Sequence, residues 1–151
     1  MRKVPLLAAA ALFLLATQAF GSGAYEILGT WKNDDGRAKI EIFDCRGRFC
    51  GTIVWLKEPN YPPDDKLGMG GKPRVDRENP DPALRTKQLL GLQIMEGFIF
   101  RSNSTWEEGH IYDPESGKTY QGKITLVSPH RMQLKGYVGI PLFGRSTTWT
   151  R

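Results

Sequence analysis

The sequence predicts an all-β protein, an antiparallel meander that closes into a barrel. The 151 residues include 17 Gly and 10 Pro, which indicates many turns and few long helices. Segments rich in β-branched and aromatic residues recur at regular spacing between turn signals, as expected for about seven or eight short strands. No segment after the N-terminal region has a strong helical period. Closure would remove the exposed sheet edges, and a two-sheet sandwich is the alternative.

Residues 1–24 have the pattern of a secretory signal peptide. A basic start is followed by eleven apolar residues from Leu6 to Ala16 and then by small residues. The apolar run is too short to cross a bilayer of ~30 Å, so we expect no membrane span. Cleavage near Ser22 or Tyr25 would release a single barrel domain, residues 25–151. We expect it to be secreted across the inner membrane into the periplasm, and a buried N-terminal helix is the alternative.

Charge and composition argue against several classes of partner. Removal of the signal peptide leaves 19 basic and 16 acidic residues, a net charge of +3, without a clustered basic stripe, so no nucleic acid is expected. Two Cys and two widely separated His do not form a zinc motif. The acids between Asp64 and Asp81 lack the calcium-loop pattern and are interrupted by prolines, which favours solvated loop charges. We therefore expect no metal and no cofactor.

The two cysteines predict a disulfide and a hairpin. An exported protein folds where thiols oxidise, so Cys45 and Cys50 are expected to be bridged. Residues 38–43 alternate with period two, and residues 49–56 are rich in β-branched and aromatic residues. A two-residue turn at 47–48 would place Cys45 opposite Cys50. In that register Ile42 meets Ile53, and Ile40 meets Trp55 on the same face.

A long connection, from Lys57 to about Gly97, is expected to carry short helical turns. It contains six prolines, and a stretch of this length without structure is uncommon in a small domain. Asn79 or Asp81 could cap one such turn, with a proline at an early position. Residues 89–95 are expected to pack the connection onto the main body. Strands are then expected at 105–112, at 118–127, around Met132 and Leu134, and at 145–151.

Several motifs resemble the family called domain of unknown function 2147. They are Gly29-Thr30-Trp31, residues 53–56, 79–85, 89–92 and 136–145, and the ending Thr148-Trp149-Thr150-Arg151. This is a family of exported bacterial proteins, and the resemblance implies no activity. More loosely, the Gly-x-Trp opening is similar to lipocalin-like (calycin) barrels. That resemblance implies that Trp31 plugs a closed end and that Arg151 or Arg145 lies across its ring.

Catalytic signals are weak, so the sequence does not demand an enzyme. A nucleophilic site needs a nucleophile, a base and an orienting group within reach of one another. His130 is expected in a solvated turn, and His110 is expected either on an exposed strand face or in an aromatic wall. Neither histidine lies in a nucleophile-elbow or zinc motif.

Three functions are compatible with these patterns. The first is non-catalytic binding of a small apolar or amphipathic ligand in the barrel mouth. The second is a filled barrel that contacts an envelope protein or the wall through the 139–144 loop or the long connection. The third is an enzyme using an acid or His110. For the first, Arg145 could anchor a carboxylate or phosphate, and the expected wall residues are Trp55, Tyr112, Tyr120, Tyr137 and Phe143.

Overall fold

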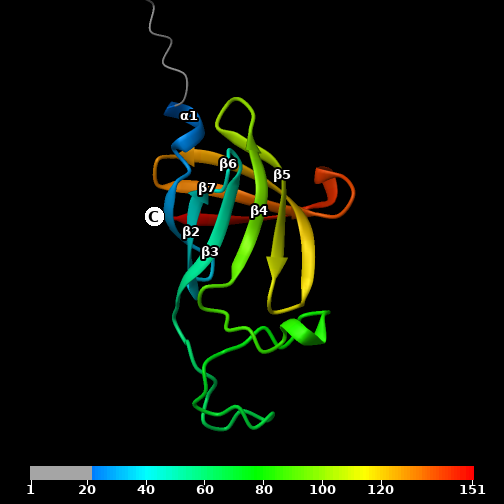
Figure 1. Ribbon diagram of the computed structural model, residues 1–151. Helices are drawn as coiled ribbons and strands as arrows, with labels where there is room; N and C mark the ends of the chain where they lie inside the picture. The colour runs from blue at the N-terminus through cyan, green and yellow to red at the C-terminus, as the bar shows by residue number, and fades with distance from the viewer. Residues whose placement is uncertain (1–21) are drawn as a thin grey trace, which may run out of the picture.

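Eight antiparallel strands form the body of the protein in the computed structural model, which describes residues 22–151 (Figure 1). A short helix, α1 (Ser22–Tyr25), precedes them, and two 3-10 turns, η1 (Pro82–Leu84) and η2 (Pro141–Phe143), lie in loops. The strands are β1 (Gly29–Lys32), β2 (Ala38–Asp44), β3 (Phe49–Leu56), β4 (Gln93–Phe100), β5 (Thr105–Asp113), β6 (Lys118–Ser128), β7 (Arg131–Tyr137) and β8 (Arg145–Thr150).

The strands form a closed barrel in chain order, which confirms the predicted meander. Each strand pairs antiparallel with the next, and β8 returns to β1 through the pair Lys32–Thr150. The residues that face inward are apolar and form one continuous core. Closure therefore leaves no open sheet edge, and the sandwich alternative is wrong.

The β2–β3 hairpin has the predicted disulfide but a different register. Cys45 and Cys50 are bonded, with their Cα atoms 5.9 Å apart. The loop has four residues, 45–48, so that Asp44 pairs with Phe49, and the expected pair of Cys45 with Cys50 is wrong. The Asp44 side chain accepts a hydrogen bond from the Gly47 amide at 2.7 Å, and this local bond from side chain to backbone favours the longer loop over a two-residue turn. The shift is by two residues, so Ile40, Ile42 and Ile53 still face the core.

Trp55 lies outside the barrel rather than opposite Ile40. A β-bulge between Lys39 and Ile40 in the β2–β3 ladder pairs Trp55 with Lys39. The bulge changes which face the following side chain occupies. Trp55 is 40% exposed, and the Lys39 ammonium lies 5.2 Å from the centroid of its ring.

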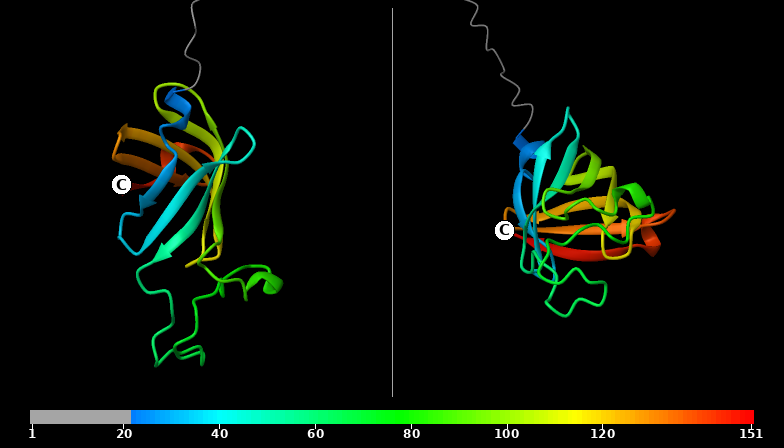
Figure 2. Two further views of the ribbon diagram at one scale, coloured as in Figure 1. Left: turned by 60° about the vertical axis from the view of Figure 1, so that its left-hand side comes forward. Right: turned by 60° about the horizontal axis from the view of Figure 1, so that its bottom comes forward.

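The long connection is shorter than expected because β4 begins at Gln93. Met95 and Phe98 both point into the core although they are three residues apart. Gly97, at φ 75°, lies between them and interrupts the alternation of inward and outward side chains. Because of this interruption, the period-two pattern of the sequence does not indicate a strand here. Residues 57–92 form the insertion, which extends beyond one end of the barrel (Figures 1 and 2). Within it, the Asp81 side chain caps η1 by accepting from the Ala83 amide, as predicted.

One end of the barrel is closed by Trp31 and Arg151. The Trp31 indole donates a hydrogen bond to the carbonyl of Ile27 at 2.8 Å, and its side chain is fully buried. The Arg151 guanidinium lies 4.2 Å from the ring centroid of Trp31. The same guanidinium donates to the carbonyls of Leu28, Glu26 and Pro129 at 2.6–2.7 Å. The closure implied by the lipocalin-like resemblance is confirmed, and Arg151 rather than Arg145 lies across the Trp31 ring.

The predicted signal peptide lies outside the described residues except for its last three positions. These belong to α1, which sits over the closed end (Figure 1). The Trp106 indole donates to the carbonyl of Ala24 at 3.2 Å, and Ala24 packs against the core. Ala24 thus joins α1 to the barrel.

Candidate functional site

The opposite end of the barrel is open and contains a cavity of about 680 Å³. It lies where β3 ends and β4 begins, between the barrel and the insertion. The part of its wall that lies inside the barrel is formed by apolar side chains from five strands: Ile40, Ile53, Leu56, Ile111, Leu134 and Trp149. The barrel is therefore hollow at this end.

The cavity ends where Phe98 fills the barrel. Gly109 and Gly122 are paired across β5 and β6 and face this ring. A Cβ atom added at Gly122 would lie 2.5 Å from Phe98 Cζ, and one at Gly109 would overlap the ring. Two glycines are thus needed for Phe98 to lie across the interior. The inward residues nearer the mouth, Tyr120 and Ile111, line the cavity.

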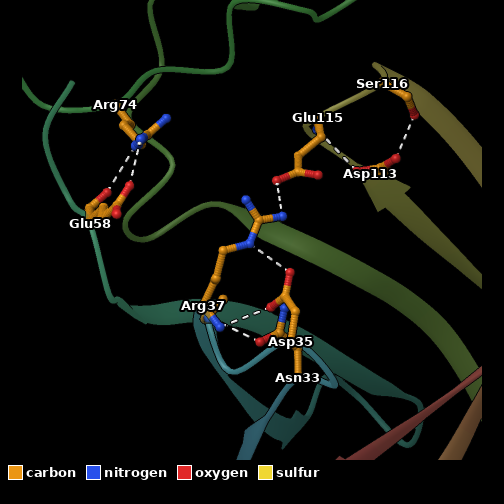
Figure 3. A network of polar contacts seen from close by, with 9 residues as sticks. Asn33, Asp35, Arg37, Glu58, Arg74, Asp113, Glu115 and Ser116 are labelled. Carbon is orange, nitrogen blue, oxygen red and sulfur yellow. Dashed lines mark hydrogen bonds and ion pairs between the residues drawn. The ribbon is translucent and has the colours of Figure 1, made fainter. Parts of the chain in front are cut away.

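Charged side chains surround the mouth and hold two of its turns together (Figure 3). Arg37, in the turn after β1, bonds to Asp35 at 2.6 Å and reaches Glu115, in the β5–β6 turn, at 2.6 Å. Desolvation opposes ionisation of Asp35, but hydrogen bonds from Arg37 and its charge hold the pKa of Asp35 below its usual value. These groups are exposed, so the pairs shape the rim more than they stabilise the fold.

The insertion supplies a second part of the rim. Arg74 pairs with Glu58 at 3.2 Å, which links two segments of the insertion (Figure 3). Tyr61 is buried, and the guanidinium groups of Arg74 and Arg77 lie 5.3 and 4.5 Å from its ring centroid. Its hydroxyl donates to the carbonyl of Val75 at 3.1 Å. The insertion therefore has a small ordered core of its own beside the cavity.

A buried carboxylate joins the insertion to the barrel. Asp76 is 1% exposed, and the hydroxyl of Tyr112, at the end of β5, donates to its Oδ1 at 2.7 Å. Asn79 Nδ2 donates to Oδ2 at 2.7 Å. Desolvation, together with the hydrogen bond to Asp76 and its charge, raises the pKa of Tyr112 above its usual value. Both carboxylate oxygens are used, so the group is a tether between two elements.

The sequence-predicted site residues divide into two groups. Tyr112, Tyr120 and Arg145 line the cavity. The other three do not line it. Trp55 is turned outward by the bulge, and Phe143 is 80% exposed in η2. Tyr137 is paired with Gln121, and the β7 residues at the cavity are Leu134 and Gly136, which have the opposite parity.

The rim residues of the insertion and the turns were not predicted. Arg37, Tyr61, Arg74 and Arg77 come from irregular segments, where no periodicity assigns a face. Neither histidine lines the cavity: His110 is exposed on β5 and His130 is exposed in a turn. Among residues 22–151 no group of three or more His, Cys, Asp or Glu is arranged to hold a metal ion.

An eight-stranded antiparallel barrel with one end closed by a Trp–Arg pair and the other open over a cavity is a lipocalin-like fold. Residues 29–151 match the family described as "Uncharacterized protein conserved in bacteria (DUF2147)", and the chain belongs to that family.

The fold is also similar to a solved structure described as "Protein HP1028 from the human pathogen Helicobacter pylori belongs to the lipocalin family". The TM-score is 0.68 at 22% identity, over 82% of this chain and 81% of that chain. No curated protein matches the sequence. Within residues 22–151 no helix is both long enough and apolar enough to cross a membrane.

Proposed function

We propose that the protein binds a small amphipathic ligand, with the apolar part inside the barrel and an anionic head at Arg145. The observation that carries this proposal is the open cavity of about 680 Å³ with an apolar wall. Ligand sites of small molecules are typically concave, mostly apolar and ~300–1,000 Å³ in volume. The function is binding rather than catalysis, and the position of both histidines away from the cavity supports that choice.

Arg145 is the proposed anchor because of the charges around it. Three other arginines at the mouth, Arg37, Arg74 and Arg77, form ion pairs with acidic side chains. Arg145 forms no ion pair with any residue in the described part of the chain, although it lines the cavity on the same strand as Trp149. A carboxylate or phosphate head would give this guanidinium a charge-assisted, bidentate partner.

We also propose that the protein is exported and works in the periplasm. The Cys45–Cys50 disulfide is compatible with an oxidising compartment. Of the two candidate cleavage points, the one after Gly21 would keep Ala24, whose carbonyl accepts from Trp106. The expected N-terminus is therefore Ser22, which mass spectrometry of the exported protein would check. A mature chain that starts at Tyr25 would contradict this choice.

Fluorescence titration with a dansyl-labelled fatty acid tests the binding proposal. Arg145→Ala should weaken binding at least about tenfold, because even one of the two charge-assisted hydrogen bonds contributes about 1.5–3 kcal/mol. It should not weaken binding of the methyl ester of the same probe, which has no anionic head. Arg131→Ala, an exposed arginine at the far end of the neighbouring strand β7, is the matched control.

A second pair of variants tests whether the probe enters the barrel. Thr147 lines the cavity and Thr148, its neighbour on β8, is exposed. Thr147→Trp should abolish binding by filling the cavity, whereas Thr148→Trp should leave it unchanged. Equal effects of the two tryptophans, or no binding of the probe by the unchanged protein, would contradict the proposal.

A further inference from the structure

The loop between β7 and β8 exposes four large apolar side chains. Val138 is 77% exposed, Ile140 52%, Leu142 77% and Phe143 80%. Residues 138–144 contain only apolar residues, Gly and Pro. We call this segment the apolar loop. It projects from the side of the barrel in orange and red, away from the insertion (Figure 1). A contiguous exposed apolar group of this kind usually marks an interaction site.

The apolar loop has a defined conformation. Its tip is the 3-10 turn η2, in which the Gly144 amide donates to the carbonyl of Pro141 at 3.0 Å. Gly144 lies against β7, because a Cβ atom there would be 2.8 Å from the carbonyl oxygen of Gly136. The side chains of Leu142 and Phe143 are therefore presented to the solvent by an ordered turn. Because the loop is already ordered, it loses little conformational entropy when these side chains bind to a partner surface.

The strands beside the apolar loop are basic and free of acids. No Asp or Glu follows Glu115 in the sequence, and the basic residues of β7 and β8 nearest to the loop are Lys135 and Arg145. Lys135 lies at the base of the loop, since a Cβ atom at Gly144 would be 2.9 Å from its Cε. Arg145 follows the loop directly. The apolar tip is thus flanked by positive charge, which complements an anionic surface.

We propose that the apolar loop docks the protein on an anionic lipid bilayer. Leu142 and Phe143 enter the interface between head groups and acyl chains, and Lys135 lies at the level of the lipid phosphates. Apolar insertion and electrostatic attraction to anionic lipid act together in peripheral binding of this type. A bilayer is a better partner for this protruding loop than a second protein. Four side chains on one loop supply less than the ~800 Å² per partner that a stable protein–protein interface buries.

The proposal goes beyond ligand binding in the cavity and can fail separately from it. Arg145 connects the two sites, because it follows the apolar loop and also lines the cavity. Docking would therefore hold the cavity mouth close to a lipid surface. The Thr147→Trp variant, with its cavity filled, should still bind vesicles if the apolar loop is responsible.

Vesicle flotation of the full exported chain tests the docking surface. The unchanged protein should float with phosphatidylcholine vesicles that contain phosphatidylglycerol, and much less with phosphatidylcholine alone. The double variant Leu142→Ser/Phe143→Ser should lower the partition coefficient at least ~10-fold, because two large apolar groups no longer leave water. Leu67→Ser is the matched control, since Leu67 is 69% exposed on the insertion, and it should bind as the unchanged protein does.

A charge variant separates the electrostatic contribution. Lys135→Gln should weaken binding about fivefold on vesicles with phosphatidylglycerol and not on neutral vesicles, as for one basic residue near an anionic surface. Equal flotation of the double variant and the Leu67→Ser control would overturn the proposal. So would a dimer in light scattering that the double variant converts to a monomer without any vesicle binding, which would assign the loop to self-association.

Discussion

Substitution of Arg151 tests how the barrel is closed. The guanidinium donates three hydrogen bonds to backbone carbonyls, those of Leu28, Glu26 and Pro129, and lies over the ring of Trp31. These contacts join the segment before β1 to the β6–β7 turn and to the last residue of the chain. The strands β1 and β8, where the barrel closes, share only one register pair. Arg151 therefore makes much of the contact across this closing junction, which we call the seam.

The magnitude follows from these contacts. A hydrogen bond contributes about 0.5–1.5 kcal/mol, and a cation–π contact at an exposed site about 0.5–1 kcal/mol. Arg151 is exposed to solvent, which places each contribution at the lower part of its range. Arg151→Ala should therefore lower the free energy of unfolding by about 2–4 kcal/mol. Arg151→Lys should recover less than half of this, because an ammonium cannot reach three carbonyls in the same fork geometry.

Urea unfolding followed by tryptophan fluorescence measures this loss as a lower midpoint at unchanged slope. Arg145→Ala is the control, because Arg145 lies at the opposite end of β8, the strand that Arg151 directly follows, and makes no ion pair within the described chain. It should change stability by less than ~0.5 kcal/mol. Equal midpoints for Arg151→Ala and Arg145→Ala would refute the reasoning, because the seam would then not depend on the guanidinium.

Three further predictions concern stability. Tyr112→Phe leaves an oxygen of buried Asp76 without its donor and should cost about 1–3 kcal/mol in urea unfolding. Because the pKa of Tyr112 is raised in the folded protein, the unfolded chain loses this proton first, so stability should fall above pH 10.0 in the unchanged protein and less so in Tyr112→Phe. The double variant Cys45→Ser/Cys50→Ser should lose about 2 kcal/mol, the entropy of a short closed loop, and equal stability would contradict it. Gly122→Ala should cost about 2–3 kcal/mol by overpacking the interior, and an unchanged melting temperature would show that the aromatic ring can move aside.

The parts of the fold that were predictable from the sequence are those with regular alternation. In β6, Tyr120, Ile124 and Leu126 have one parity, and they face the interior as the period-two pattern indicates. The β2–β3 disulfide followed from the compartment and the spacing of two cysteines. The position of Arg151 over Trp31 followed from the lipocalin-like resemblance, which left Arg145 as the other option.

The errors occur where the backbone departs from regular pleating. A bulge in β3 turns Trp55 outward, and Gly97 interrupts β4 between two inward residues. In β5, Glu108 has a φ of 63°, and the parity shifts there so that Trp106 is buried and His110 is exposed, which is one of the two positions that the sequence left open for His110. A bulge depends on the partner strand and on local turn geometry, and neither is visible in the alternation of one segment.

The candidate site was only partly predictable for the same reason. Tyr112, Tyr120 and Arg145 come from the ends of strands and line the cavity. Tyr61 and Arg74 come from the insertion, where prolines and glycines remove the periodicity from which a face could be assigned. Their place at the mouth follows from tertiary contacts between segments far apart in the chain.

The most direct measurement of ligand binding is the NMR detection of contacts between the protein and a bound, ¹³C-labelled fatty acid. If the ligand enters the open end, nuclear Overhauser effects should connect its chain to the methyl groups of Ile53 and Leu134, and its carboxylate should shift the resonances of Arg145. Contacts confined to the outer face of the barrel, or to the exposed side chains of η2, would contradict an interior binding site.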